Sequence, residues 1–345
     1  MTQFKNVALH SLSYVLPDEV LSSTAIEEKL AKTYTRLKLP EGRLELMTGI
    51  KERRMWPKGT RASQASAMAG KKVIAESGLK AEDIEVMMHC AVSRDFLEPA
   101  TASVVHNLTG LSSQCQIFDV SNACLGFLNS ISILAGMIDS GQIKYGLVVS
   151  GENGRPLVEK TIDALLDPGL TRKTIKPQIA SLTIGCGAAA AVLCHSSLAP
   201  QAPRVLGGSV MTASEFSDLC EGDTSDDSRL SMATDSEKLL NEGVNLAEQT
   251  YALFRDEFSD WNDVNCQRYI GHQVGLAHRN LLFDRLKLSI EKDYSTFENY
   301  GNIGSVSLPL TLALAQEKQF IKKGERVTLM GIGSGINCMF MALQC

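Results

Sequence analysis

The stretch DVSNACLGFL, residues 119–128, joins a predicted strand to a predicted helix and places a cysteine at the join. QIFDV before it is typical of a buried strand, and LGFLNSISILAGMI after it has apolar residues at helical spacing. Unpaired backbone N–H groups and the helix dipole favour an anion there, so we expect a lowered pKa for the Cys124 thiol. The carboxyl end of a strand is also where α/β folds place their sites. From this segment alone, a nucleophile and a small buried residue are equally good interpretations of Cys124.

Short β-like runs alternate with amphipathic helical stretches along almost the whole chain, which predicts a layered α/β fold. Near QAPRVLGG, residues 201–208, the pattern restarts with a new strand and a long helix. We therefore predict two related halves, residues 1–200 with the cysteine and residues 201–345 with a histidine, an asparagine and a glycine turn. The acidic segment 221–236 is expected to be a surface loop or flexible cover. A metal site is less favoured because no histidine accompanies these carboxylates.

Several helices have recognisable ends. A capping box, Thr24 with Glu27, predicts the start of a helix in SSTAIEEKLAKTYTRL. Gly78 predicts the end of another in ASQASAMAGKKVIAESG, and Pro309 fits near the first turn of LPLTLALAQEKQF.

The composition narrows the class of protein. Its 345 residues are 44% hydrophobic, enough for a substantial core, and its net charge of -5 comes without any basic stripe that would suit nucleic acid. No apolar run approaches the ~20 residues needed to span a bilayer, and the N-terminus MTQFKNVALHSLSYV lacks the parts of a signal peptide. The nine cysteines are scattered and lack CxxC pairs. We therefore expect free thiols, no metal and a cytoplasmic protein.

Two further strand–helix junctions carry side chains that suit chemistry with Cys124. YIGHQVGLAH places His272 after a predicted strand, and YGNIGSVSLP places Asn302 in a glycine-flanked turn before a helix. Together they can donate two hydrogen bonds to one oxyanion, and a histidine also suits proton transfer and thiolate pairing. A lone histidine after a strand is more often structural, and we interpret His278 in that way. MGIGSG, residues 330–335, lacks the spacing of a dinucleotide fingerprint and fits a backbone anion hole better.

NACLGF, GHQ, GNIG and GIGSG occur in the order found in the thiolase superfamily, and they most resemble its ketoacyl synthase III branch. TGIKERRMW and GCGAAAAVL are similar to further elements of that branch, so the resemblance covers nearly the whole chain. It implies the thiolase fold, a five-layered αβαβα arrangement of two duplicated halves, and an obligate homodimer. It also implies that Cys124 becomes acylated and that His272 with Asn302 stabilises an enolate or oxyanion. The backbone N–H groups of Cys124 and Ser334 would hold the thioester oxygen, although family members often carry glycine where Ser334 stands.

SRDFLEPATAS, residues 93–103, resembles the OleA-type head-to-head condensing enzyme of bacterial olefin biosynthesis. In that type a glutamate matching Glu98 reaches into the partner subunit's site and helps to deprotonate the α-carbon of an acyl chain. The alternative is that Glu98 caps the next helix or pairs with Arg94. Tyr300 is a departure, since the OleA type tends to have histidine there.

The resemblance implies a non-decarboxylative Claisen condensation of two fatty acyl-CoA molecules without a cofactor. The product would be a 2-alkyl-3-oxoacyl thioester, hydrolysed to a β-keto acid. Expected partners are acyl-CoA and a second copy of the chain, with an acyl carrier protein or downstream pathway enzymes as further possibilities. Two alternatives stay open. One is a decarboxylative synthase III that uses acyl-CoA and a malonyl carrier protein, and the other is an acyl-thioester binding or acyl-transfer protein without condensation.

Overall fold

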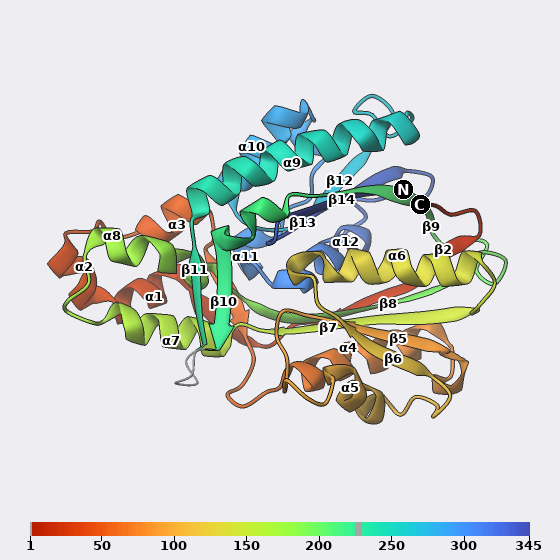
Figure 1. The fold of residues 1–345 in the computed structure, drawn as a ribbon, viewed down its shortest axis with the longest axis horizontal. Coiled ribbons are helices and arrows are strands. Elements are labelled where there is room, and N and C mark those ends of the chain that lie inside the picture. The colour runs from red at the N-terminus through yellow and green to blue at the C-terminus, as the bar shows by residue number, and fades with distance from the viewer. Residues whose placement is uncertain (1, 225–229) are drawn as a thin grey trace.

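The computed structural model describes residues 2–224 and 230–345, and its main strands form two stacked sheets (Figure 1). The first sheet comprises β2 (Val7–Val15), β5 (Val86–Cys90), β6 (Gln116–Val120), β7 (Tyr145–Asn153) and β8 (Cys186–His195). The second comprises β1 (Thr2–Gln3), β9 (Arg204–Thr212), β12 (Arg268–Gly271), β13 (Arg326–Gly333) and β14 (Asn337–Gln344). Strands β2 and β9 connect the two sheets through one residue pair, Ala8 with Arg204.

The two sheets have the same strand order. The first runs β6-β5-β7-β8-β2, which is third, second, fourth, fifth and first in its own chain order. With β1 left out and Asp293 counted in the place of a third strand, the second runs Asp293-β12-β13-β14-β9, which is third, second, fourth, fifth and first, with the same pattern of parallel and antiparallel pairs. Asp293 occupies the place of the third strand and forms a parallel bridge with Tyr269. This correspondence supports two related halves, while their boundary at residue 200 stays a prediction.

Helices cover both sheets and fill the space between them (Figure 1). The outer layers contain α4 (Ala62–Ser77) and α5 (Thr101–Thr109) on one side and α9 (Ser236–Glu257) and α10 (Leu276–Leu286) on the other. The central layer contains α6 (Gly126–Asp139) and α12 (Ser307–Glu317). Side chains alternate along the strands, so Met88 packs in the central cluster while Met87 packs under the outer helices. The expected five-layered αβαβα fold is confirmed.

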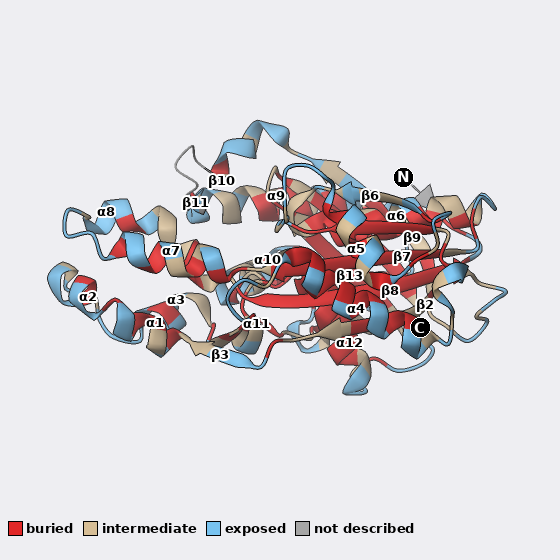
Figure 2. Cartoon of the chain, turned by 90° about the horizontal axis from the view of Figure 1, so that it is seen from below, coloured by how far each residue is buried: buried red, intermediate tan, exposed pale blue. Residues whose placement is uncertain are grey.

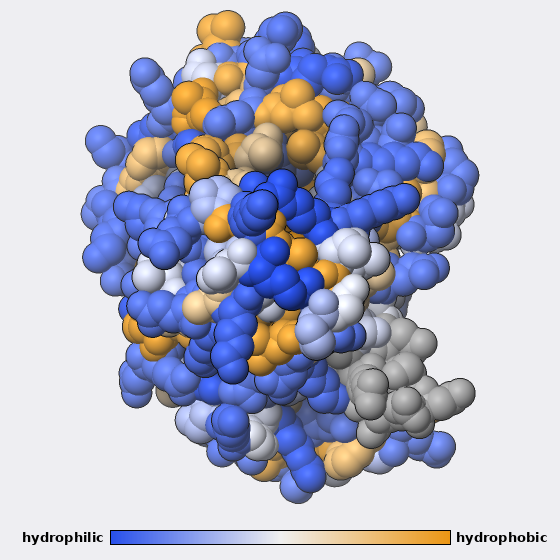
Figure 3. All heavy atoms as spheres, turned by 90° about the vertical axis from the view of Figure 1, so that its left-hand side faces the viewer, coloured by the Kyte–Doolittle hydropathy of each residue, from blue (hydrophilic) through white to orange (hydrophobic). Residues whose placement is uncertain are grey.

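A smaller lobe projects from one end of the sheets (Figure 1). It contains β3 (Glu19–Ser22), β4 (Glu52–Met55), α1 (Ser23–Lys29), α2 (Ala31–Leu37), α3 (Arg43–Thr48), α7 (Arg155–Leu165) and α8 (Arg172–Ile175). Its helices expose their outer faces, whereas the strands of the main body are buried (Figure 2). This end of the molecule presents apolar side chains among polar ones (Figure 3), and Leu46 and Met47 of α3 are exposed. None of the helices in the described part of the chain is long and apolar enough to cross a membrane.

The segment 221–236 differs from the expected loop. β10 (Cys220–Thr224) and β11 (Leu230–Thr234) form an antiparallel hairpin, and α9 begins directly after it with Asp235 as its cap. The part of the predicted loop at 225–229 lies outside the described residues. The remaining short elements are α11 (Phe297–Tyr300) and the 3-10 turns η1 (Ala81–Asp83), η2 (Ala123–Leu125), η3 (Lys176–Thr183), η4 (Ser214–Leu219), η5 (Ile290–Lys292) and η6 (Gly304–Val306).

Candidate active site

Cys124 lies in the turn η2 between β6 and α6, so the thiol stands at the predicted strand–helix junction. Ala123 before it has φ +45°, in the left-handed region that few residues other than glycine adopt. The end of β13 packs directly against this turn. A Cβ atom on Gly333 would lie 3.2 Å from the Leu125 backbone nitrogen, and one on Gly331 would lie 2.5 Å from the Leu125 side chain. Glycine at these two positions therefore allows β13 to support the nucleophile turn.

The pKa of the Cys124 thiol differs in direction from the expectation. Burial raises this pKa to about 12, and the Glu152 carboxylate and the Cys220 thiol act in the same direction. The predicted lowering of this pKa by the helix N-terminus is wrong for the free protein. α6 begins only at Gly126, and burial destabilises the thiolate more than the helix end stabilises it. The thiol is therefore protonated at neutral pH before substrate binds.

His272 directly follows β12, and its backbone N–H donates to the Met330 carbonyl of β13 at 2.9 Å. The residue is 7% exposed, and its Nδ1 has no hydrogen-bond partner among the described residues. Burial and the nearby His278 lower its pKa to about 3, so the imidazole is neutral at pH 7. A neutral imidazole has one donor and one acceptor nitrogen, which suits it to accept a thiol proton or to donate to an oxyanion.

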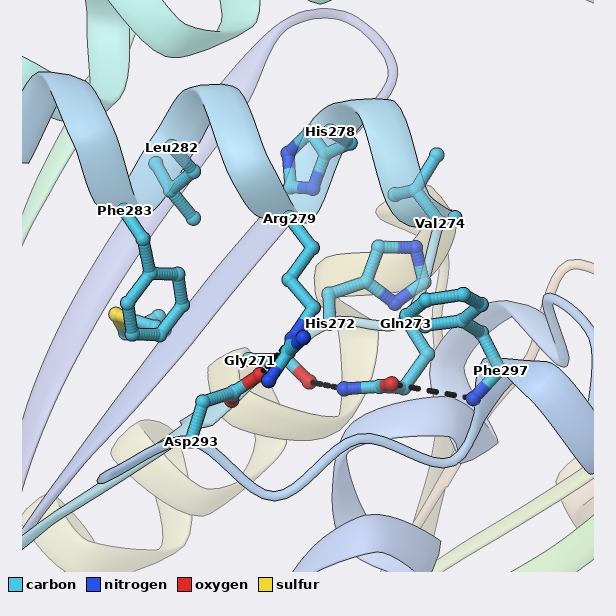
Figure 4. Close-up of a pocket in the computed structure, with 12 residues that line it drawn as sticks. Gly271, His272, Gln273, Val274, His278, Arg279, Leu282, Phe283, Asp293 and Phe297 are labelled. Carbon is cyan, nitrogen blue, oxygen red and sulfur yellow. Dashed lines mark hydrogen bonds and ion pairs between the residues drawn. The ribbon is translucent and has the colours of Figure 1, made fainter. Parts of the chain in front are cut away.

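A pocket surrounds His272 and includes Gln273, His278 and the Arg279–Asp293 ion pair (Figure 4). Gln273 Nε2 donates to the Gly271 carbonyl at 2.8 Å, and its Oε1 accepts from the Thr296 N–H at 2.9 Å. Gln273 therefore ties the His272 turn to the segment that leads to Asn302. His278 lies on α10 and lines the same pocket, and burial lowers its pKa to about 4.

Asn302 lies between α11 and η6, and its backbone is held on both sides. Its N–H donates to the Thr183 carbonyl and its carbonyl accepts from the Gly185 N–H, both at 2.9 Å. The side-chain Oδ1 accepts from the Gly304 N–H at 2.9 Å. With its oxygen engaged in this way, the Asn302 side chain offers its NH₂ donors as the free end.

Strand β13 contacts the His272 and Cys124 junctions, and the turn after Asn302 packs against the Cys124 turn. Met330 holds the His272 backbone, the glycines of β13 support η2, and η6 packs against η2. Ser305 in η6 also donates to the Cys90 carbonyl at 3.1 Å, and Gly126 packs against that same cysteine. The thiol turn and the Asn302 turn are thus neighbours, and their assembly with His272 into one site for acyl transfer stays a prediction.

Ser334 is partly buried in the glycine turn after β13. Asn337 on the far side of this turn donates from Nδ2 to Asn122 Oδ1 at 3.1 Å, which links the glycine turn to the segment before Cys124. The anion-binding role of the Ser334 N–H stays a prediction. Tyr300, the departure from the OleA type, is partly buried and packs against the central hydrophobic cluster.

Glu98 is exposed, and the preceding Leu97 is 94% exposed. The first turn of α5 is capped instead by Asp119, which accepts from the N–H groups of Thr101 and Ala102 at 2.8 Å each. Arg94 donates to Ser121 Oγ at 2.8 Å. Within the described residues, Glu98 therefore serves neither as the helix cap nor as the partner of Arg94.

Glu152, which was not among the residues predicted from the sequence, lies at the end of β7 and is 4% exposed. Its carboxylate accepts hydrogen bonds from Val92, Ser93 and Ser305. The available signal was one carboxylate in the otherwise uncharged strand YGLVVSGEN. Within residues 2–224 and 230–345, no group of three or more His, Cys, Asp or Glu side chains is arranged to hold a metal ion.

Comparison with known proteins agrees with this geometry. The family model of 3-oxoacyl-[acyl-carrier-protein] synthase III matches residues 118–213, and the model of its C-terminal part matches residues 257–345. The chain is 37% identical to the acyl-CoA:acyl-CoA alkyltransferase of Xanthomonas campestris pv. campestris, over 97% of both chains. It is 38% identical to the Shewanella oneidensis protein of the same name, over 99% of both. A cysteine-to-serine variant of Xanthomonas campestris OleA, solved with lauric acid and lauroyl-CoA, matches with a TM-score of 0.95 and 36% identity, covering 99% of this chain and 100% of that one.

Proposed function

The chain belongs to the OleA-type acyl-CoA:acyl-CoA alkyltransferase family, within the synthase III enzymes, and on that premise we propose the reaction that it catalyses. It is an acyltransferase. We propose a non-decarboxylative, head-to-head condensation of two fatty acyl-CoA molecules. The observation that carries the proposal is Glu98, an exposed carboxylate on an apolar loop that neither caps α5 nor pairs with Arg94. A decarboxylative synthase needs no such base, because loss of carbon dioxide supplies the carbanion.

In the first half-reaction, the Cys124 sulfur attacks the thioester carbonyl of one acyl-CoA. The resting thiol is neutral, so its proton must leave as the new carbon–sulfur bond forms, and the neutral His272 imidazole is the proposed acceptor. The backbone N–H groups of Cys124 and Ser334 would stabilise the oxyanion. The carbon–sulfur bond to CoA then breaks, and the CoA thiolate takes the proton from His272.

In the second half-reaction, the partner subunit's Glu98 removes a proton from the α-carbon of the second acyl-CoA. His272 and Asn302 donate hydrogen bonds to the enolate oxygen, and the loss of one such donor typically costs ~3 kcal/mol. The α-carbon attacks the acyl-enzyme carbonyl, a carbon–carbon bond forms, and the bond to Cys124 breaks. The Cys124 thiolate takes up the proton that Glu98 removed from the α-carbon, which restores the thiol and the carboxylate. Water then hydrolyses the 2-alkyl-3-oxoacyl-CoA to the β-keto acid and CoA. No cofactor takes part in this scheme.

The proposed reaction requires a homodimer, and two surface features support one. Strand β6 stands at the end of the strand order, so one of its edges is unpaired among the described residues. The neighbouring loop exposes Val92, Phe96 and Leu97, which are 56%, 42% and 94% exposed. Exposed apolar clusters of this kind mark interfaces. A second copy on β6 would cover both features and receive Glu98.

The proposed substrates are CoA thioesters, in keeping with the lauroyl-CoA bound to the Xanthomonas campestris relative. An acyl carrier protein as an alternative donor, and a downstream enzyme that takes over the β-keto acid, stay predictions. The nine cysteines are free thiols in the structure, which suits a reducing compartment, and we propose that the enzyme acts in the cytoplasm.

Mass spectrometry of the products tests the function. Myristoyl-CoA alone should yield a β-keto acid that contains both acyl chains, and acetyl-CoA with malonyl carrier protein should not be required. Glu98→Gln should leave acylation of Cys124 nearly intact and strongly reduce this product. Condensation only in the presence of a malonyl thioester would indicate a decarboxylative synthase. CoA release without a carbon–carbon product would indicate an acyl-transfer protein.

A further inference from the structure

Glu152 is a buried carboxyl group without a cationic partner among the described residues. Its Oε1 accepts from the Val92 N–H at 2.8 Å and from the Ser305 N–H and Oγ at 3.2 and 2.8 Å, and its Oε2 accepts from the Ser93 N–H at 3.0 Å. Burying an ionised carboxylate is costly unless hydrogen bonds compensate for the lost water. These four bonds supply that compensation, so the arrangement depends on the charge at this position.

The donors to Glu152 come from two segments with different proposed tasks. Val92 and Ser93 open the loop that carries Glu98, whereas Ser305 follows Asn302 within one turn. Strand β7 holds the same loop a second time, because the Asn153 N–H donates to Ser93 Oγ at 3.0 Å.

The Asn302 side of this link is equally tight. A Cβ atom on Gly304 would lie 2.7 Å from Glu152 Oε1, so the carboxylate fits closely against the turn that orients the asparagine. Gly304 has φ +53°, and its N–H donates to Asn302 Oδ1. Glycine fits this position because it adopts a positive φ without strain and has no Cβ atom that would clash with Glu152.

The carboxylate also acts on the nucleophile through its charge, since it disfavours ionisation of the Cys124 thiol. Other titratable groups in this region of the described chain are the thiols of Cys220 on β10 and Cys90 on β5 and the carboxylate of Asp119 on β6. Cys90 is 0% exposed, so reagents in solution reach Cys124 in preference to it.

We infer that Glu152 is a positioning residue that joins the Asn302 turn of its own subunit to the loop that delivers Glu98 to the other subunit. The part of this inference that concerns Glu98 rests on the proposed function, whereas the effect on Cys124 does not. Glu152 would thereby couple the oxyanion donor of one active site to the base of the other.

Glu152→Gln tests the effect on the nucleophile, because glutamine keeps the size of the side chain and removes its charge. Alkylation by iodoacetamide, mapped to Cys124 by mass spectrometry, should follow a pH profile displaced to lower pH and be several-fold faster at neutral pH. Glu27→Gln is the matched control. Glu27 is also a buried carboxylate, which accepts from the N–H groups of Gly42 and Leu44 and from Tyr34 OH, but it lies on α1. An unchanged profile in Glu152→Gln, or an equal displacement in Glu27→Gln, would overturn the inference.

Mixed dimers of two differently tagged chains test the link between the sites. One chain carries Cys124→Ser with Glu152→Gln, and the other is wild type. The only Cys124 thiol then belongs to the wild-type chain, and the Glu98 that serves its active site comes from the chain with Glu152→Gln. Acylation should proceed at the rate of a mixed dimer with Cys124→Ser alone, and condensation should fall several-fold. Equal rates of condensation in the mixed dimers with and without Glu152→Gln would contradict the proposed coupling.

Two further variants keep the outcomes distinguishable. A mixed dimer that pairs Cys124→Ser and Glu98→Gln in one chain with a wild-type chain should lose condensation. If it retains condensation, Glu98 does not act across subunits, and the proposed function fails independently of Glu152. Should Glu152→Gln not fold, Ser305→Ala removes the hydroxyl whose single O–H lies within hydrogen-bonding distance of Glu152 and of the Cys90 carbonyl, and it should lower condensation more than acylation. Equal loss of both steps would contradict the inference.

Discussion

Cys124 and His272 are both uncharged at neutral pH, because burial raises the pKa of the thiol to about 12 and lowers that of the imidazole to about 3. A thiolate–imidazolium pair is therefore not the resting state. The proton must move as the substrate is attacked, which links reactivity of the thiol to the arrival of a thioester.

The pH dependence of alkylation should reveal this resting state. A raised thiol pKa means that the thiolate fraction is small at pH 7 and grows about tenfold with each pH unit. We expect the rate of Cys124 alkylation by iodoacetamide to rise steadily from pH 7 to about pH 10 without a plateau, as the pKa near 12 requires. A plateau below pH 8 would mean that the free enzyme holds a thiolate.

Removing the oxyanion donors should separate the two half-reactions. His272→Ala and Asn302→Ala are expected to lower condensation by about 10²–10³-fold, the usual cost of an oxyanion donor. In Asn302→Ala acylation should fall less, because the proposed oxyanion site of that step uses backbone N–H groups. His272→Ala should lower acylation as well, because it also removes the proposed proton acceptor of that step. Single-turnover measurement of the acyl-enzyme by intact mass, beside product formation, checks the ratio. Equal losses of acylation and condensation in Asn302→Ala would contradict this division of roles.

At this scale, the sequence identified side chains better than it identified their environment. Cys124, His272 and Asn302 could be selected because each stands in a glycine-containing or small-residue junction between a strand and a helix. The sign of the Cys124 pKa could not be predicted, because Glu152 and Cys220 reach it from distant parts of the chain. Glu152 was missed because its partners become neighbours only after folding.

Among the elements, α5 depends on a residue from another strand. Asp119 of β6 accepts from the first two N–H groups of α5 and from His89 Nδ1. Burial acts to raise the pKa of Asp119, but the hydrogen bonds from His89, Ala102 and Thr101 outweigh it and lower the pKa. This carboxylate therefore links the strand before the nucleophile to the helix after Glu98.

Asp119→Ala should destabilise the protein by about 1–2 kcal/mol, the usual cost of a lost N-cap. Since the pKa of Asp119 is lowered on folding, its contribution is present above its unfolded pKa and is lost as the pH falls through the folded value. The difference in stability between wild type and variant should therefore shrink below about pH 4. Denaturant unfolding at pH 7 and at pH 3 measures it, and a difference that grows in acid would contradict this account.

Local sequence signals predicted element ends unevenly. Gly78 ends α4 as predicted, with φ +74°, because a glycine C-cap requires only local backbone freedom. The predicted box of Thr24 with Glu27 is wrong, since Ser22 caps α1. Glu27 instead holds the backbone of Gly42 and Leu44, a tertiary demand that overrides the local pattern. The hairpin β10–β11 was missed because its first strand, CEGDT, lacks the apolar alternation that indicates a sheet.

For the whole molecule, the exposed loop beside β6 gives the dimer a test. Leu97→Asp places a charge where the proposed interface would bury a leucine and forfeits about 2 kcal/mol per subunit. Light scattering should find more monomer, and condensation should fall while the melting temperature of the chain stays close to that of Leu198→Asp. Leu198 is also exposed, at 44%, but it lies in the turn after β8. A dimer as stable as the wild type in Leu97→Asp would contradict the proposed interface.

The layered class could be predicted because strand and helix patterns alternate along the chain. The equal strand order of the two sheets could not, because the two halves share little detectable sequence identity. It depends on pairings between strands that are far apart in the chain, such as β9 with β14.

The central layer makes the two halves of the molecule depend on each other. α6 belongs to the first half and α12 to the second, and both bury apolar side chains in the one cluster between the sheets. A single half on its own would leave its central helix facing water. Neither half is therefore expected to keep its fold as an isolated chain, because each central helix needs the other to cover its apolar face.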